Sequence, residues 1–429
     1  MEIEEIKKII VDQKEEIEEL FQKEKIIERE LDPQRLKRFL KYPNILVISG
    51  VRRSGKSVLA LLLLKEEKYG YINFDDERLV NFTKNDLNKL LQAFYELYGE
   101  NLEYFIFDEI QNIENWELFI TRLRRTKKII ITGSNAKLLS SELSTHLTGR
   151  YVDFTLYPFS FREYLKFQNV ILKKEDFYST KKISQIKRLL KEYIALGGFP
   201  EVFKFGKTII KRIYGDIVNK DILFRYKIKN KSAFRELAKY LVSNFGQKIS
   251  YSKLKNIFAI KNVHTIKNYV EYLSSVFLVF VLDKFFYKLK QQFIAPKKIY
   301  VVDTGLIISL AFQFSENTGR LIENVVLSEI LRKKAYLDEE LEIYYWQDYF
   351  GKEVDFVLKK NRKIIQLIQV CVNISDLAVK KREINSLIKA SEQLKCNNLL
   401  VITSDYEGQE KVKNKKINFI PLWKWLITY

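Results

Sequence analysis

An eight-residue segment constrains this 429-residue chain more than any other part of it. Gly50 to Ser57 reads GVRRSGKS and matches the pattern G-x-x-x-x-G-K-[ST] at every fixed position. It follows the apolar run Ile45–Ser49, which has the length of a buried parallel strand, and precedes an apolar helical segment at Val58–Lys65. A strand, a glycine-containing loop and a helix in this order predict a phosphate-binding loop rather than a plain turn.

The chemistry of this loop predicts ATP and Mg²⁺ as cofactors. Glycines let backbone N–H groups turn inward around the phosphates, and the N-terminus of the following helix favours an anion. We expect Lys56 to reach the β- and γ-phosphate oxygens and the Ser57 hydroxyl to bind Mg²⁺. The predicted nucleotide-binding residues are Gly50, Val51, Arg52, Arg53, Ser54, Gly55, Lys56, Ser57 and Val58.

Two acidic residues end the next strongly apolar run. Tyr104–Phe107 is followed by Asp108 and Glu109. Beside a P-loop, Asp108 is predicted to hold Mg²⁺ through water and Glu109 to act as the general base on the attacking water. The alternative is an Asp-Glu pair that caps a helix. An adjacent pair, rather than a lone aspartate, favours hydrolysis over binding alone.

Further candidates for catalysis follow the run Lys128–Thr132. Asn135 or Ser134 is predicted to lie near the γ-phosphate, although Ser134 could instead cap a helix. Arg150 is a candidate arginine finger, acting in cis or from a neighbouring subunit, with an ordinary surface arginine as the alternative.

Strand and helix patterns alternate through the first third of the chain. Apolar runs at Tyr71–Phe74, Tyr104–Phe107 and Lys128–Thr132 add strands to Ile45–Ser49, which predicts an α/β domain with a parallel sheet. An amphipathic helix is predicted over residues 3–31, and Asp32-Pro33 predicts the start of another helix. Residues 160–245 are predicted to be mostly helical, and residues 298–429 mixed α/β, beginning with a run at 298–302.

Composition bears on partners and location. The formal charge is +20, from 74 Lys and Arg against 54 Asp and Glu, which suits an anionic partner such as DNA; the alternative is a lysine-rich, solvated surface, since the basic residues are spread along the whole chain. With two cysteines, two histidines, an acidic N-terminus and no long apolar run, we expect no zinc site, no signal peptide and no membrane span. A reducing cytoplasm fits these features.

The motifs together resemble a family. The P-loop, Phe107–Gln111, Ile131–Asn135 and Leu156–Glu163 look like those of archaeal and bacterial AAA+-type, STAND-like ATPases with a C-terminal domain of unknown function, DUF4143. Gly197–Glu201 resembles an element of the helical lid in STAND-type ATPases, and this resemblance implies that Pro200 lies by the nucleotide base. The resemblance covers nearly the whole chain.

The resulting expectation is an α/β protein of five parts. A P-loop NTPase parallel sheet with a helical lid is followed by a winged-helix module and a C-terminal α/β restriction-endonuclease-like domain. The predicted boundaries are 1–35 for an N-terminal helical segment, 36–165 for the ATPase core, 166–230 for the lid, 231–290 for the winged helix and 291–429 for the nuclease-like domain.

Residues 234–286 resemble a winged helix. Helices are predicted at Phe234–Phe245, Ser252–Phe258 and Val263–Ser275, with wing strands in Phe277–Phe286. The third helix suits the major groove of DNA, where lysine contacts phosphate and asparagine reads adenine. Its candidate DNA contacts are Lys261, His264, Lys267 and Asn268. The alternative is a module that only packs between domains.

Residues 320–372 resemble a restriction-endonuclease-like core. The resemblance implies that Glu323 and Asp355 bind a metal and that an acid and a lysine occupy the next strand. This chain has Gln369 in place of the acid and Cys371 in place of the lysine, and neither substitute is suited to metal-assisted cleavage. Lys352, Lys380 and Lys381 are candidate replacements for the lysine.

Three functional readings follow. The first is an ATP-hydrolysing multi-domain switch that binds DNA. The second is a slow ATPase that signals to a protein partner or acts as a homo-oligomer. The third is an ATP-gated, metal-dependent nuclease, which the Gln369 and Cys371 replacements disfavour.

Overall fold

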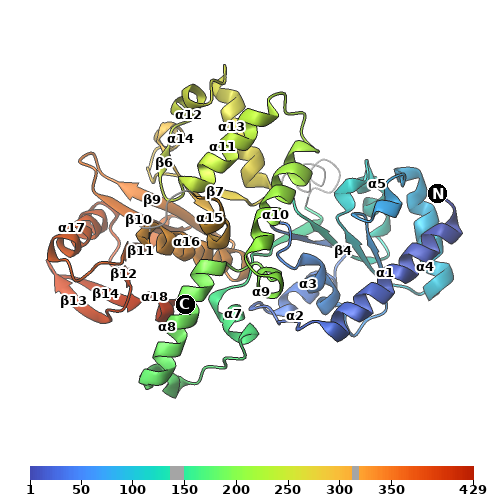
Figure 1. Cartoon of the computed structure of the whole chain (residues 1–429), viewed down its shortest axis with the longest axis horizontal. Helices are drawn as coiled ribbons and strands as arrows, with labels where there is room; N and C mark the ends of the chain where they lie inside the picture. Colours follow the sequence, from blue (N-terminus) through green and yellow to red (C-terminus); the bar gives the residue numbers. More distant parts are fainter. Residues whose placement is uncertain (136–148, 312–317) are drawn as a thin grey trace. The chain divides into compact units, whose positions relative to one another are not determined.

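The computed structural model describes residues 1–135, 149–311 and 318–429, and these form two compact units (Figure 1). The first unit comprises Met1–Tyr157 with Ser275–Phe277, and the second comprises Pro158–Ser274 and Leu278–Tyr429. The first unit holds one sheet and the second holds two, and each unit is described by itself.

The first unit is built on a five-stranded sheet with the order β2-β3-β4-β1-β5. Every neighbouring pair in it is parallel. The strands are β1 (Ile45–Ser49), β2 (Tyr69–Asn73), β3 (Tyr104–Asp108), β4 (Lys128–Gly133) and β5 (Tyr151–Thr155). The predicted parallel α/β sheet is therefore confirmed. The sequence did not reveal β5, because this edge strand buries only one of its five residues and has no apolar run.

Helices flank this sheet. They are α1 (Ile3–Lys23), α2 (Pro33–Phe39), α3 (Lys56–Leu63), α4 (Leu87–Tyr98) and α5 (Trp116–Leu123). The predicted amphipathic helix is confirmed, but it ends at Lys23 rather than near residue 31. The start of α2 is also confirmed, because the Asp32 side chain accepts a hydrogen bond from the Gln34 backbone and Pro33 occupies the first turn.

The second unit begins with the helical region that the sequence predicted. Its helices are α7 (Phe161–Phe167), α8 (Thr180–Leu196), α9 (Val202–Phe205), α10 (Thr208–Asp216) and the π-helical turn η5 (Ile217–Leu223). A capping box between Ser160 and Glu163 starts α7, and both residues are buried.

Four further helices accompany a small antiparallel sheet of order β6-β8-β7. The elements are α11 (Lys231–Ser243), β6 (Lys248–Ile249), α12 (Tyr251–Ile257), α13 (Val263–Ser275), β7 (Val279–Leu282), α14 (Leu289–Ile294) and β8 (Lys297–Val301). The predicted third helix is α13. The placement of both wing strands in Phe277–Phe286 was wrong, because β7 pairs with β8, which lies beyond α14.

The C-terminal part of the second unit holds a six-stranded mixed sheet of order β13-β14-β12-β11-β10-β9. Its strands are β9 (Leu341–Gln347), β10 (Glu353–Lys360), β11 (Lys363–Cys371), β12 (Leu399–Thr403), β13 (Gly408–Val412) and β14 (Lys415–Pro421). The helices are α15 (Thr304–Leu310), α16 (Thr318–Tyr336), α17 (Leu377–Leu394) and α18 (Leu422–Thr428). The predicted mixed α/β character is confirmed. Across the ranges described, no helix has the length and apolar content needed to cross a bilayer.

Candidate functional site

The loop between β1 and α3 has the backbone of a phosphate cradle. Gly50 has φ +144°, and a Cβ there would lie 2.2 Å from the Leu156 carbonyl oxygen. Gly55 has φ +94° and caps α3. Both positions therefore require glycine, and they direct the loop between them around the start of the helix.

The polar groups of this loop are buried. Lys56 is 5% exposed, and its Nζ donates to the Val51 carbonyl at 3.2 Å and lies 3.9 Å from Glu109 Oε1. The Ser54 hydroxyl is buried and has no hydrogen-bond partner within the described ranges. A buried orphan hydroxyl beside a buried lysine is costly unless a polar ligand satisfies it, so these residues fit the phosphates of a nucleotide.

Arg29 braces the P-loop from outside the motif. Its Nη1 donates to the Ser54 carbonyl at 2.8 Å, and its Nη2 donates to the Tyr157 carbonyl. Arg52 within the loop pairs with Asp75 at 3.0 Å. Sequence reasoning missed Arg29 because the helix was predicted to continue past it, whereas the chain leaves α1 at Lys23 and returns to the loop.

Asp108 lies at the carboxyl end of β3 and is 2% exposed. The Tyr71 hydroxyl on β2 donates to its Oδ2 at 2.9 Å, and the Thr132 hydroxyl on β4 donates to its Oδ1. Burial, then the negative charge of Asp108, holds the pKa of Tyr71 well above its usual value, so the phenol remains a donor. Two neighbouring strands thus fix the orientation of this carboxylate.

Glu109 follows Asp108 in the left-handed region, with φ +53°. Its carboxylate accepts a hydrogen bond from the Gln111 amide and one from the Ser134 hydroxyl at 3.4 Å. A non-glycine residue in this region costs on the order of 1 kcal/mol and is concentrated at functional sites. Asn135 is fully buried just after β4. The structure therefore brings together Lys56, Asp108, Glu109, Ser134 and Asn135 at one edge of the sheet.

Arg150 lies at the other end of the sheet. Its backbone carbonyl accepts from Ile45 N at the start of β1, whereas the P-loop follows the end of this strand. Five residues of strand span about 16 Å. Arg150 is exposed there and does not reach the P-loop of its own chain, so the option of a finger acting in cis is wrong.

Pro200 belongs to the second unit, and its contact with a base stays a prediction. The loop before it is held tightly: Asp303 Oδ2 accepts from Gly198 N at 2.5 Å and Oδ1 accepts from Gly305 N at 2.8 Å. A Cβ on Gly197 would lie 1.9 Å from Asp303. Burial raises the pKa of Asp303 to about 6 although these backbone N–H groups lower it.

The predicted DNA-contact residues are accessible. Lys261 precedes α13 and is exposed, as are His264 and Lys267 on the helix, while Asn268 is half-buried. The helical positions 264, 267 and 268 share one face at spacings of three and four.

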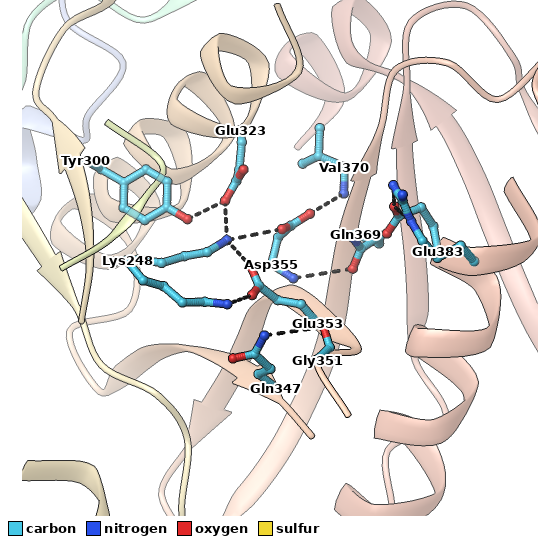
Figure 2. A network of polar contacts seen from close by, with 12 residues as sticks. Lys248, Tyr300, Glu323, Gln347, Gly351, Glu353, Asp355, Gln369, Val370 and Glu383 are labelled. Carbon is cyan, nitrogen blue, oxygen red and sulfur yellow. Dashed lines mark hydrogen bonds and ion pairs between the residues drawn. The ribbon is translucent and has the colours of Figure 1, made fainter. Parts of the chain in front are cut away.

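A second polar cluster lies where β8, α16 and β10 meet (Figure 2). Lys298 is 3% exposed, and its Nζ lies 2.7 Å from Glu323 Oε1, 2.6 Å from Glu353 Oε1 and 3.4 Å from Asp355 Oδ1. The Tyr300 hydroxyl also donates to Glu323, at 2.5 Å. The predicted pair Glu323 and Asp355 is therefore brought together, but around a lysine.

The pKa shifts in this cluster reflect burial and charge. Burial raises the pKa of Asp355 well above its usual value, and Glu323 raises it further while Lys298 opposes this. Burial alone lowers the pKa of Lys298, but Tyr300 and the surrounding carboxylates outweigh burial and hold it well above its usual value. Lys298 therefore remains an ammonium ion.

Gln369 completes the cluster. Its Oε1 accepts from the Asp355 backbone N–H at 3.3 Å, and its Nε2 donates to Glu383 at 2.7 Å (Figure 2). Cys371 is buried, which raises its pKa to about 11. Of the lysines predicted to compensate, Lys380 pairs with Glu410, and Lys352 and Lys381 are exposed. Sequence reasoning missed Lys298, because the only sign of it was a pair of lysines, Lys297 and Lys298, just before the apolar end of β8.

The cluster forms one wall of an open hollow of about 580 Å³. Its acidic lining comes from Glu323, Glu353, Asp355 and Glu383, and its basic lining from Arg320, Lys352 and Arg382, all three of which are exposed. Among the described residues, no group of three or more His, Cys, Asp or Glu is arranged to hold a metal ion.

Comparisons with known protein families match three regions of the chain. Residues 42–165 match the AAA domain family, residues 187–317 match the domain of unknown function DUF8612, and residues 318–425 match DUF4143. Among solved structures, the Walker-type ATPase PABY2304 of Pyrococcus abyssi superposes with a TM-score of 0.44 and 17% identity, over 66% of this chain and 96% of that chain. A superposition this loose supports no argument about function.

Whole-length relatives are more informative. Uncharacterized protein MJ1544 of Methanocaldococcus jannaschii is 36% identical over 96% of this chain and 93% of its own length. An uncharacterized protein of Haemophilus influenzae is 32% identical over 93% of this chain and 98% of its own length. The chain belongs with these relatives to the family of P-loop ATPases that join an N-terminal AAA domain to a C-terminal DUF4143 domain.

Proposed function

We propose that this protein binds ATP with Mg²⁺ at Gly50–Ser57 and hydrolyses it. The observation that carries the proposal is the convergence of buried Lys56, Asp108 and Glu109 at the end of a parallel sheet, beside a Ser54 hydroxyl that lacks a partner within the described part of the chain. In this arrangement the loop N–H groups and Lys56 would hold the phosphates. They supply positive charge that is already in place before phosphoryl transfer begins.

Ser57 and Asp108 are the residues that would hold Mg²⁺. When bound, this ion neutralises charge on the phosphate oxygens. Tyr71 and Thr132 orient Asp108 by donating to its two oxygens. Because each oxygen keeps a further lone pair, the carboxylate can still accept from water on the metal.

Glu109 is proposed as the general base. Its carboxylate bonds to Gln111 and Ser134 and lies near Lys56, so it is held at the phosphate end of the loop. Release of the Gln111 bond would free an oxygen to accept a proton from the attacking water. Asn135, which is buried just after β4, is proposed to place its polar side chain near the γ-phosphate. An arginine finger at Arg150 would need a second copy of the chain.

The Lys56 assignment is tested by nucleotide binding and phosphate release in Lys56→Ala. We expect loss of binding by at least about 100-fold, since a charge-assisted contact to phosphate in a buried site is removed. Lys65→Ala, at an exposed lysine just beyond α3, is the matched control and should behave as wild type. Wild-type affinity in Lys56→Ala would refute the assignment.

We further propose that nucleotide state switches the second unit and that this unit contacts DNA through α13. The formal charge of +20 and the exposed Lys261, His264 and Lys267 support DNA over a protein partner. Measuring ATP turnover with and without duplex DNA, at two salt concentrations, distinguishes a DNA partner from a protein partner. Stimulation that fades with salt favours DNA, and turnover indifferent to DNA favours a protein partner or a second copy.

A further inference from the structure

The second polar cluster differs from the metal site that an endonuclease-like resemblance implies. Such a site needs oxygen ligands from Glu323, Asp355 and position 369. Gln369 offers only a neutral amide oxygen, a poorer ligand for a divalent cation than a carboxylate; this oxygen already accepts from the Asp355 backbone, and the amide nitrogen is bonded to Glu383. The residues present therefore do not fit a divalent cation in this arrangement.

An ammonium ion occupies the centre of the carboxylates instead. Lys298 Nζ lies within 3.4 Å of one oxygen from each of Glu323, Glu353 and Asp355. An ammonium has three N–H donors, so three carboxylate acceptors saturate it. The ammonium thereby compensates, from within the chain, part of the negative charge of these carboxyl groups.

The backbone keeps Lys298 in this place. The Asn324 side chain on α16 accepts from Val301 N at 2.9 Å and donates to Val301 O at 2.8 Å, which joins β8 to the helix that carries Glu323. Lys298 and Tyr300 are two residues apart on β8 and so point to the same side, where both reach Glu323.

A second lysine adds another positive charge to the cluster. Lys248 on β6 lies directly opposite Lys298 in the antiparallel ladder, a pairing that would repel if left alone. Glu353 separates the two charges, because its Oε1 pairs with Lys298 and its Oε2 with Lys248 (Figure 2). Both lysines are thus matched to the acidic residues of the hollow.

We propose that Lys298 is a built-in cation that takes the place of a divalent metal, so that the DUF4143 hollow is closed to Mg²⁺ and Mn²⁺ and does not cleave phosphodiesters. Three carboxyl groups surround one central position, and the Lys298 ammonium fills it. Removing the Lys298 ammonium should therefore convert the cluster into a real metal site. This inference is independent of the ATPase assignment.

The test is Mn²⁺ binding to the nucleotide-free full chain, followed by electron paramagnetic resonance of the free ion. Wild type and Lys298→Arg should show no saturable site. Lys298→Ala should gain a single site, with affinity at least about tenfold above wild type. Lys298→Ala combined with Asp355→Asn should lose this gain. Lys298→Met, which keeps the buried stem, is a second variant in case the alanine unfolds the domain.

Thermal unfolding gives an independent readout. Lys298→Ala leaves uncompensated buried carboxylates and should unfold at a lower temperature than wild type. Mn²⁺ should restore part of this loss in Lys298→Ala and Lys298→Met but should not stabilise wild type, because only the variants without the ammonium bind the ion.

Three results would overturn the proposal. One is stoichiometric Mn²⁺ binding by wild type that Asp355→Asn abolishes. Another is Mn²⁺-dependent nicking of supercoiled DNA by wild type that the same substitution abolishes. The last is a folded Lys298→Ala or Lys298→Met variant that binds no Mn²⁺, which would leave Lys298 as an ordinary structural ion pair.

Discussion

At the scale of single residues, Asp108 and the P-loop backbone are held by side chains from neighbouring strands and from the segment that follows α1. The hydroxyl groups of Tyr71 and Thr132 donate hydrogen bonds to the Asp108 carboxylate. The Arg29 side chain donates one to the Ser54 carbonyl in the P-loop. Thr132 meets Asp108 because the two are register partners in the parallel sheet. Such contacts depend on strand order, so no local pattern could have indicated them.

Tyr71→Phe tests this positioning. The bond that it removes goes to a charged acceptor and contributes about 1.5 kcal/mol, so the Mg²⁺ concentration for half-maximal turnover should rise about tenfold. Tyr69→Phe, on the same face of β2 and only partly buried, is the matched control. An equal Mg²⁺ dependence in both variants would contradict a positioning role for Tyr71.

Asp303 predicts a pH dependence of folding. Its pKa rises from the usual 3.8 to about 6 in the folded chain. The folded protein therefore binds this proton more tightly than the unfolded chain does. Proton binding by Asp303 thus stabilises the folded state, fully below pH 3.8, and this stabilisation is lost as the pH rises through about 6. From pH 5 to pH 7 the free energy of unfolding should fall by about 1 kcal/mol more in wild type than in Asp303→Asn.

Urea titrations followed by tryptophan fluorescence measure this difference. The tryptophans in the second unit are Trp346, Trp423 and Trp425, so the signal reports mainly on that unit. Asp303→Asn has no titrating group but loses an acceptor for one backbone N–H, so its absolute stability should be lower. Identical pH slopes in the two proteins would rule out the raised pKa.

At the scale of elements, strongly periodic helices were predictable and charged strands were not. The limits of α13 were predicted, since its apolar spacing is regular. In contrast, β13 and β14 went unrecognised because lysines interrupt them, and β8 was predicted as a run but not as the partner of β7. Pairing between distant strands is a tertiary property that a short run does not encode.

The exposed face of α13 carries the DNA prediction. Lys267→Ala should weaken binding to duplex DNA. The slope of log affinity against log salt concentration should also fall by about one, because one fewer counterion is released on binding. Lys411→Ala, at an exposed lysine on β13, is the control and should leave both unchanged. Equal salt slopes for wild type and Lys267→Ala would remove this face from the binding surface.

At the scale of the whole molecule, the motifs located the nucleotide site but not the character of the second unit. Gly50–Ser57, Asp108 and Glu109 were predictable because each requirement is local: a glycine conformation, a strand end, a helix start. Glu323 and Asp355 were predicted together, but Lys298 between them was not. The chemistry of that cluster depends on a residue from a different strand and sheet.

As the proposed general base, Glu109 is expected to turn a nucleotide-binding chain into an ATPase. The most direct measurement compares ATP binding and single-turnover hydrolysis in wild type and Glu109→Gln. Binding should stay within about threefold, because Gln keeps the size and a hydrogen-bonding end, while hydrolysis should fall by at least about 100-fold with loss of the base. Hydrolysis in Glu109→Gln at the wild-type rate would contradict this account.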